Sequence, residues 1–208
     1  MLESKLTIPH FYLFDDINMK NAVELRDELN SNERVKISFN DIIIKASAVV
    51  LKDHPECNVS YADGKVRQYQ NININIAVAI EGGLLVPTLR NCEEKSLYEI
   101  SEEAKVLIEK ARNKKLRPGE GMGGTFTISN LGVFGLQGSF SIINPPQAMI
   151  LTAGSIREVP VVEDGAVTVG VRMKITLSCD HRSVDGAIGA VFLSDVKNII
   201  ENPREYIL

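Results

Sequence analysis

The chain has 208 residues, of which 44% are hydrophobic and 24% charged, and its formal net charge is −4 at pH 7. These proportions are those of an ordinary globular domain, and the negative balance argues against a nucleic-acid binder. No apolar run approaches the roughly 18 residues that a membrane-spanning helix requires, and the N-terminus lacks the apolar core of a secretory signal. The three cysteines form no CxxC pair, which favours a reducing, cytoplasm-like compartment.

The first elements are a strand and a helix. Residues 6–17 predict a strand with Pro9 near its start, where the missing N–H is tolerated. Residues 18–30 carry apolar side chains at helical spacing, with Asn18 as the N-cap.

A second helix is predicted over residues 42–54. Ser38 and Asp41 form an S-x-x-D capping signal just before it. The helix is apolar almost all round, which predicts burial in the core or in a contact between subunits.

The middle of the chain predicts short strands. Residues 57–70 form a hairpin built on Asp63 and Gly64. Residues 71–80 alternate isoleucine and asparagine, which indicates one strand with an apolar and a polar face.

A strand or edge segment follows at residues 84–90, interrupted by Pro87. Ser96 and Glu99 then form a capping signal for a strongly amphipathic helix over residues 97–116.

The last third adds more strands and a helix. The predicted elements are a strand at 125–129, a strand at 148–154, a hairpin at Asp164–Gly165, a long strand ending at Ser178 and a helix at 186–201. Hairpins dominate and no linker or repeat is visible. The sequence therefore predicts one α/β domain over residues 1–208, a two-layer sandwich with a mixed, largely antiparallel sheet.

The end of the long strand holds the first candidate site residue. His181 follows the buried strand and is flanked by charged residues, so it is partly desolvated yet reachable, as a general base must be. Asp185 is placed to cap the last helix. The alternative is that His181 is only a surface loop residue, and spacing alone leaves both interpretations open.

Ser129 is the second candidate, at the end of the strand in "TFTISNLG". Its hydroxyl could donate to a developing oxyanion, or it could simply bond loop backbone. The surrounding glycines fit neither a dinucleotide-binding fingerprint nor the G-x-S-x-G motif of a serine hydrolase.

Three further possibilities rest on residue type alone. Cys179 stands two residues before His181 and could be a nucleophile, or a buried thiol acting as a small hydrophobe. The sequence contains no metal-ligand spacing such as HxxxH, so no bound metal is expected. The basic cluster at residues 109–118 could meet phosphates or could be a solvated helix end.

Several segments together resemble one family. "DHRSVDGA" at residues 180–187 resembles the DHRxxDG signature of the catalytic domain of dihydrolipoamide acyltransferases, the E2 cores of 2-oxo acid dehydrogenase complexes. "SKLTIPHFYL", "EGGLLVPTLRN", "GGTFTISNLG" and "INPPQAMILTAG" resemble other blocks of that domain in the same order, so the resemblance covers residues 4–208. It implies a chloramphenicol-acetyltransferase-like fold.

The resemblance also implies an assembly and a site. Homotrimers would build a larger hollow core, with each active site in a channel between two subunits. His181 would be the general base, and Ser129 of the neighbouring subunit would stabilise the tetrahedral intermediate. Asp185 matches the acidic position of the motif and would orient or cap the turn.

Coenzyme A is the cofactor, or more strictly the second substrate, that the resemblance implies. Its expected contacts, beside Ser129, are Arg26, Ser38, Lys115, Asn130, Gly154 and Ile156. Val133 departs from relatives that have a small hydroxyl residue there, so that contact is expected to be lost.

The implied function is acyl transfer between a dihydrolipoyl thiol and coenzyme A, by direct thiol attack on a thioester, in the cytoplasm or, in a eukaryote, the mitochondrial matrix. The lipoyl group would arrive on a domain that is not in this chain. The 2-oxo acid decarboxylase (E1) and dihydrolipoamide dehydrogenase (E3) would bind through other missing domains. The alternatives are a non-catalytic scaffold of the same fold and a hydrolase with Ser129 as nucleophile. The motifs leave the acyl group open.

Overall fold

The structure is a computed structural model that describes residues 1–31 and 36–208. A six-stranded mixed sheet forms one layer, in the order β1-β10-β9-β8-β4-β7. Its strands are β1 (His10–Asn18), β4 (Ile74–Ile76), β7 (Thr88–Leu89), β8 (Phe126–Asn130), β9 (Met149–Glu163) and β10 (Ala166–Asp180). The two pairings of β8 with β4 and β9 are parallel and the other three are antiparallel, which agrees with the predicted mixed sheet.

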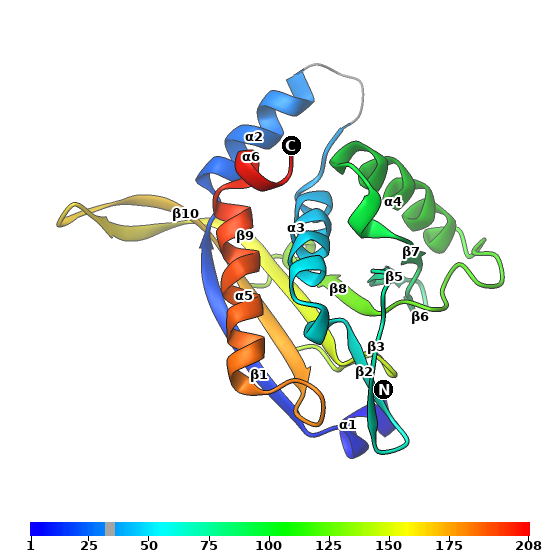
Figure 1. Cartoon of the computed structure of the whole chain (residues 1–208). Coiled ribbons are helices and arrows are strands. Elements are labelled where there is room, and N and C mark those ends of the chain that lie inside the picture. The colour runs from blue at the N-terminus through cyan, green and yellow to red at the C-terminus, as the bar shows by residue number, and fades with distance from the viewer. Residues whose placement is uncertain (32–35) are drawn as a thin grey trace.

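Helices cover one face of the sheet (Figure 1). They are α2 (Lys20–Ser31), α3 (Phe39–Asp53), α4 (Leu97–Arg112), α5 (Gly186–Glu201) and α6 (Pro203–Tyr206). The short α1 (Leu2–Thr7) precedes β1 at one end of the molecule, where the Ser4 hydroxyl donates to the Ile143 carbonyl at 2.6 Å. Two small hairpins lie outside the main sheet, β2 (Val59–Ala62) with β3 (Lys65–Gln68), and β5 (Val78–Ile80) with β6 (Gly83–Leu85). Short 3-10 turns occur at Pro55–Cys57, Cys92–Glu94 and Gly132–Phe134.

Helix α3 lies at the centre of the core. The Ser38 side chain accepts from the Asp41 backbone N–H while the Asp41 side chain accepts from the Ser38 backbone, so the predicted capping signal is a complete capping box. Ile42, Ile43 and Ile44 are all 0% exposed within the single chain. The apolar character of α3 is therefore explained by the core of its own subunit and gives no evidence of a contact between subunits.

The opposite face of the sheet is covered by an extended segment, residues 139–143. The Thr176 hydroxyl donates to the Ser139 carbonyl, and the Ser178 hydroxyl donates to the Ser141 carbonyl at 2.7 Å. This contact combines hydrogen bonds with a small apolar cluster of Ile8, Ile143 and Ile150, and the C-terminal half of β10 is buried on both sides.

Several predicted boundaries were wrong. The helix expected to start at Asn18 begins at Lys20, the strand expected at 148–154 continues to Glu163, and the long strand expected to end at Ser178 ends at Asp180. The first strand begins at His10, because residues 2–7 form α1 and Pro9 cannot pair in a ladder. Residues 71–80 do not form one strand: the pairing breaks at Ala77, and β5 joins a separate hairpin. The helix predicted to reach residue 116 ends at Arg112, since the backbone is left-handed at Lys114.

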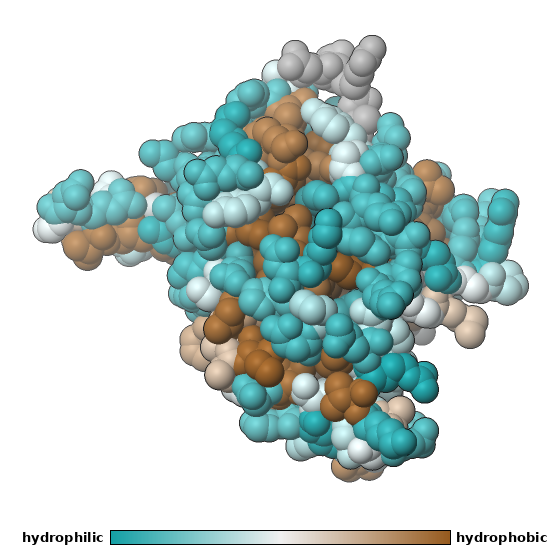
Figure 2. Space-filling model, in the orientation of Figure 1, coloured by the Kyte–Doolittle hydropathy of each residue, from teal (hydrophilic) through white to brown (hydrophobic). Residues whose placement is uncertain are grey.

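The hairpin at Asp164–Gly165 is confirmed, and it extends into a two-stranded arm beyond the body of the molecule (Figure 1). Val162, Val167 and Val169 are 68–77% exposed on this arm, whose projecting end shows a hydrophobic strip in Figure 2. Among the described residues, no helix combines the length and apolar character needed to cross a membrane.

Candidate active site

His181 is the first residue after β10 and is exposed. Its backbone N–H donates to the Pro9 carbonyl at 3.1 Å, which ties the turn to the start of β1. Its ring meets the edge of Phe11, with 4.9 Å between the ring centroids. The imidazole is thus held against an apolar surface on one side and open on the other, as a general base requires.

The residues on either side of His181 form an ion pair that sequence reasoning did not assign. Asp180 is 1% exposed, and Arg182 donates to its two carboxylate oxygens at 2.9 and 2.7 Å. The Arg182 guanidinium also stacks over the ring of Tyr61 at 4.4 Å. These hydrogen bonds raise the pKa of Arg182 and fix the turn from which His181 projects. The two opposite charges on either side of His181 were the sequence signal from which this ion pair could have been predicted.

Asp185 caps α5, as predicted. Its carboxylate accepts from the backbone N–H groups of Ala187 and Ile188, both at 2.9 Å. The hydrogen bonds of Asp185 therefore go to the helix that follows the turn, which supports a capping role.

Ser129 lies near the end of β8 and is 9% exposed. It lines a cavity of about 510 Å³ together with two other predicted residues, Ser38 and Asn130. In the described part of the chain, no group hydrogen-bonds to the Ser129 hydroxyl, which leaves it able to donate to a ligand.

Ser129 and His181 do not meet within one chain. In the sheet register Ser129 is opposite Thr152 of β9, which is opposite Thr176 of β10. His181 lies five residues beyond Thr176 and two strands away from Ser129, roughly 15 Å along the strands and about 10 Å across them. A shared site requires that the two residues come from different subunits.

The other predicted coenzyme contacts are more scattered. Arg26 donates to the Ile37 carbonyl at 3.2 Å and stacks on the Phe39 ring at 4.8 Å, so it lies beside the N-terminus of α3. Lys115 is exposed beyond the end of α4 and does not line the cavity of Ser129.

Gly154 has a packing reason to be glycine. A Cβ at this position would lie 2.0 Å from the Gln137 carbonyl oxygen, because the loop after β8 crosses over β9 there. Ile156, two residues on, is half-buried on the same strand and lies outside the cavity wall.

Cys179 does not have the environment of a nucleophile. It is 0% exposed, and burial raises the pKa of its thiol, which disfavours the reactive thiolate. The interpretation of Cys179 as a small core hydrophobe is the one its environment supports.

The other two histidines are engaged in structure. His10 bonds the Ile8 carbonyl and the Ile143 N–H through its two ring nitrogens. His54 bonds Asp195 and Glu56. Within residues 1–31 and 36–208, no three His, Cys, Asp or Glu side chains are grouped so that they could hold a metal ion.

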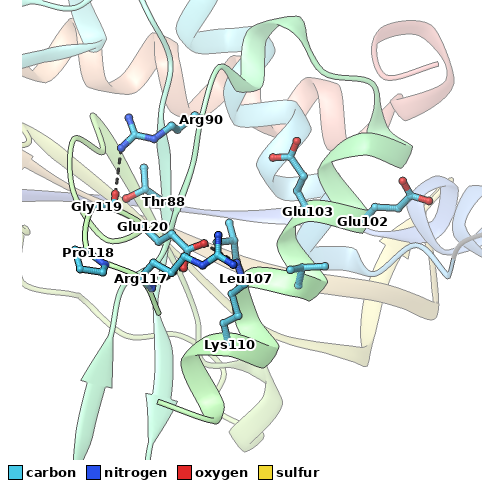
Figure 3. Close-up of a pocket in the computed structure, with 11 residues that line it drawn as sticks. Thr88, Arg90, Glu102, Glu103, Leu107, Lys110, Arg117, Pro118, Gly119 and Glu120 are labelled. Atoms are coloured by element: carbon cyan, nitrogen blue, oxygen red, sulfur yellow. Dashed lines mark hydrogen bonds and ion pairs between the residues drawn. The ribbon is translucent and has the colours of Figure 1, made fainter. Parts of the chain in front are cut away.

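A second cavity of about 700 Å³ lies between α4 and the loop that follows it (Figure 3). Its wall mixes acids and bases, with Lys110 paired to Glu120 at 2.5 Å. Arg90 donates across the loop to the carbonyls of Gly119 and Met122. None of the predicted site residues lines this cavity, and its wall carries as many acids as bases.

Comparison with known proteins gives a consistent result. The model of the family described as 2-oxoacid dehydrogenases acyltransferase (catalytic domain) matches residues 1–208. The dihydrolipoyllysine-residue acetyltransferase component of the pyruvate dehydrogenase complex of Rickettsia bellii is 44% identical over 100% of this chain and 51% of its own length. The mitochondrial counterpart from Dictyostelium discoideum is 46% identical over 100% of this chain and 33% of its own length. The chain thus spans about half, or less, of the length of these relatives.

Solved structures agree. Azotobacter vinelandii dihydrolipoamide acetyltransferase superposes with a TM-score of 0.91 at 32% identity, over 100% of this chain and 87% of that one. The cubic core of a pyruvate dehydrogenase multienzyme complex gives 0.91 at 31% identity, with the same coverage. A chloramphenicol acetyltransferase, 16% identical over 93% of this chain and 89% of its own, gives 0.60 and confirms the predicted fold class.

Proposed function

The chain belongs to the 2-oxoacid dehydrogenase acyltransferase family, whose model is that of a catalytic domain, and on this premise we propose that it transfers an acyl group between a dihydrolipoyl thiol and coenzyme A. Residues 1–208 would form one acyltransferase domain. The observation that carries the proposal is the exposed imidazole of His181 on a turn fixed by the ion pair of Arg182 with the buried Asp180.

The spacing of the proposed residues supports their roles. The structure of the Azotobacter enzyme addresses the role of a serine, a histidine and an asparagine in its catalytic mechanism. There the histidine follows the serine by 52 positions and the asparagine follows the histidine by four. Ser129, His181 and Asp185 have the same separations. The aspartate that replaces the asparagine fits a capping role.

The chemistry needs no enzyme nucleophile, because one thiol attacks the thioester of the other directly. A free thiol has a pKa near 8.5 and is mostly protonated at neutral pH. A neutral imidazole at His181 removes that proton as the new C–S bond forms, which is worth roughly 10²–10⁴ in rate. The carbonyl oxygen then becomes an oxyanion, and the Ser129 hydroxyl donates to it, a contribution of about 3–4 kcal/mol. The proton returns to the departing thiolate.

The site is completed by a second subunit. We place His181 of one subunit opposite the Ser129 cavity of its neighbour in a homotrimer, and trimers in a larger hollow core. The roughly 15 Å by 10 Å offset between the two residues within one chain supports this arrangement. So does the fold shared with a cubic core.

Coenzyme A would occupy the Ser129 cavity, where Ser38 and Asn130 contact it. Arg26, beside the N-terminus of α3, would lie at the rim, and Lys115, Gly154 and Ile156 would contact the coenzyme only outside the cavity walls. The lipoyl group would come from a domain outside these 208 residues, and other such domains would bind the decarboxylase and dehydrogenase components. In a bacterium the enzyme would work in the cytoplasm, and in a eukaryote in the mitochondrial matrix.

The test is acyl transfer from a panel of acyl-coenzyme A donors to free dihydrolipoamide. We expect His181→Ala to lower kcat by about 10²–10⁴ while the mass of the assembly stays the same. His54→Gln is the matched control, since His54 only joins α3 to α5, and it should keep wild-type kcat. Near wild-type turnover in His181→Ala would remove the general-base assignment of His181. Absence of transfer by the wild-type assembly would favour the non-catalytic scaffold instead.

A further inference from the structure

The cavity of Ser129 has an unusual charge balance. Its described lining is made of apolar side chains, two hydroxyls and two amides, and Arg112 is the only charged residue among them. No carboxylate lies in this wall. A ligand that fills the cavity therefore meets one uncompensated positive charge.

Arg112 is the last residue of α4 and is exposed. Ile108, one turn earlier, lines the same cavity, so this face of the helix end is turned toward it. Among the described residues, no Asp or Glu lies within 4.0 Å of the Arg112 guanidinium, in contrast to Lys110 of the same turn, which is paired with Glu120. Arg112 thus has its donors available for an anion.

The N-terminal end of α3 contributes polar groups to the same cavity. Ser38 is the N-cap of this helix, and the next-but-one residue, Asn40, also lines the cavity. The positive end of this helix is already matched by the buried carboxylate of Asp41, which leaves Arg112 as the charge available to an anionic ligand. The Asn40 side-chain carbonyl is buried and has no hydrogen-bond partner among the described residues, so the wall also offers an acceptor to a ligand N–H or O–H.

We propose that Arg112 binds a phosphate group of coenzyme A and so selects the phosphorylated coenzyme over shorter thiols. This inference rests on the proposed function, because it takes the thiol end of the coenzyme to lie at Ser129. A guanidinium makes paired, charge-assisted hydrogen bonds to phosphate oxygens that a lysine cannot match in geometry. The apolar part of the cavity, which includes Ile76, Val78 and Leu84, would take the uncharged arm of the coenzyme.

The test is steady-state transfer with Arg112→Gln. Loss of one charge-assisted hydrogen bond lowers binding affinity by about 10- to 100-fold. We therefore expect KM for coenzyme A to rise by that factor, while kcat at saturation stays within about twofold. With pantetheine, which has no phosphate, the variant and wild type should have the same KM. Dephospho-coenzyme A identifies the phosphate: the effect disappears if Arg112 binds the 3′-phosphate and remains if it binds the pyrophosphate. Arg112→Lys should recover part of the loss.

Arg117→Gln is the matched control. It removes the same charge five residues later in the chain, but Arg117 lines the other cavity. An unchanged KM for coenzyme A in Arg112→Gln would overturn the proposal. So would an equal rise in KM for pantetheine, or a rise in KM for coenzyme A in Lys115→Gln but not in Arg112→Gln. The proposed function is tested separately, because it fails if the wild type transfers no acyl group. In that case the affinity of wild type and Arg112→Gln for coenzyme A, measured by calorimetry, would still test the role of Arg112.

Discussion

At the scale of single residues, His181 owes its position to its neighbours in the chain. Asp180 is buried with its charge, and Arg182 reaches back to neutralise it. The Asp180 carboxylate also accepts a hydrogen bond from the Arg182 backbone N–H at 3.0 Å, which closes the turn. The histidine makes none of these bonds, so its ring stays available while its backbone is fixed.

We predict that Arg182→Met lowers both stability and turnover. It leaves Asp180 buried without a cation, which costs about 3 kcal/mol, the low end of the range because Arg182 is itself partly exposed. As a positioning residue, Arg182 should affect kcat by at least about tenfold with KM for coenzyme A little changed. Chemical unfolding and steady-state kinetics measure the two effects.

Two further variants separate the ion pair from general damage. Arg204→Met removes an arginine from the exposed pair with Glu28 and should change neither quantity measurably. The double variant Asp180→Asn/Arg182→Met should regain part of the lost stability, because no buried charge is left unpaired. A double variant no more stable than Arg182→Met would contradict this account.

At this scale, the residues whose roles follow from local rules could be predicted from the sequence. Asp185 and Ser38 were identified because caps depend only on neighbours two or three positions away. Arg112 was noticed only as one of several basic residues, since nothing local distinguishes it from Lys114 or Lys115. Its distinction comes from the cavity, which brings α4 next to the ends of β8 and α3.

At the scale of elements, helix starts were predicted better than strand ends. The capping signals at Ser38 and Ser96 mark the starts of α3 and α4 correctly. The break at Ala77 has no local signal, because the isoleucine–asparagine alternation continues up to it. It arises where the Ala77 N–H bonds the Ile128 carbonyl and the chain leaves the main sheet for the β5–β6 hairpin.

His54 links two of these elements and should make their packing depend on pH. It stands at the C-terminal end of α3 and bonds Asp195 of α5 at 2.7 Å. Burial alone would lower the pKa of His54, but the bonds to Asp195 and Glu56 outweigh it and raise the pKa above the ordinary 6.5.

The folded chain therefore binds this proton more tightly than the unfolded chain does. The stabilisation is full below pH about 6.5 and is lost as the pH rises through the folded-state pKa. We predict that His54→Gln is less stable than wild type at about pH 5.5 and that the difference shrinks by about pH 8.5. Urea unfolding at both pH values measures it, and a difference independent of pH would show that the carboxylates contribute nothing through the imidazole.

At the scale of the whole molecule, the layered architecture followed from the order of hairpins and helices in the sequence. Local patterns could not show which strands would be neighbours: the contacts of β4 with β8 and of β1 with β10 join segments that are far apart in the chain. The cavity and the relation between Ser129 and His181 depend on this order. For this reason residue spacing alone could suggest the site residues only one by one. The family resemblance implied that Ser129 and His181 act from different subunits, and the fold supplies the distance between them within one chain.

If the proposed site is shared between subunits, that separation should let two inactive variants restore activity to each other in a mixed assembly. Ser129→Ala subunits keep the imidazole and His181→Ala subunits keep the hydroxyl, and each variant alone should lose about two or more orders of magnitude in kcat. Co-refolded in equal amounts and mixing at random in a closed ring, they would pair an intact imidazole with an intact hydroxyl at about a quarter of the seams. Complementation to about that fraction of wild-type turnover is the expected result, and mixed assemblies as inactive as their parents would mean that each chain works alone.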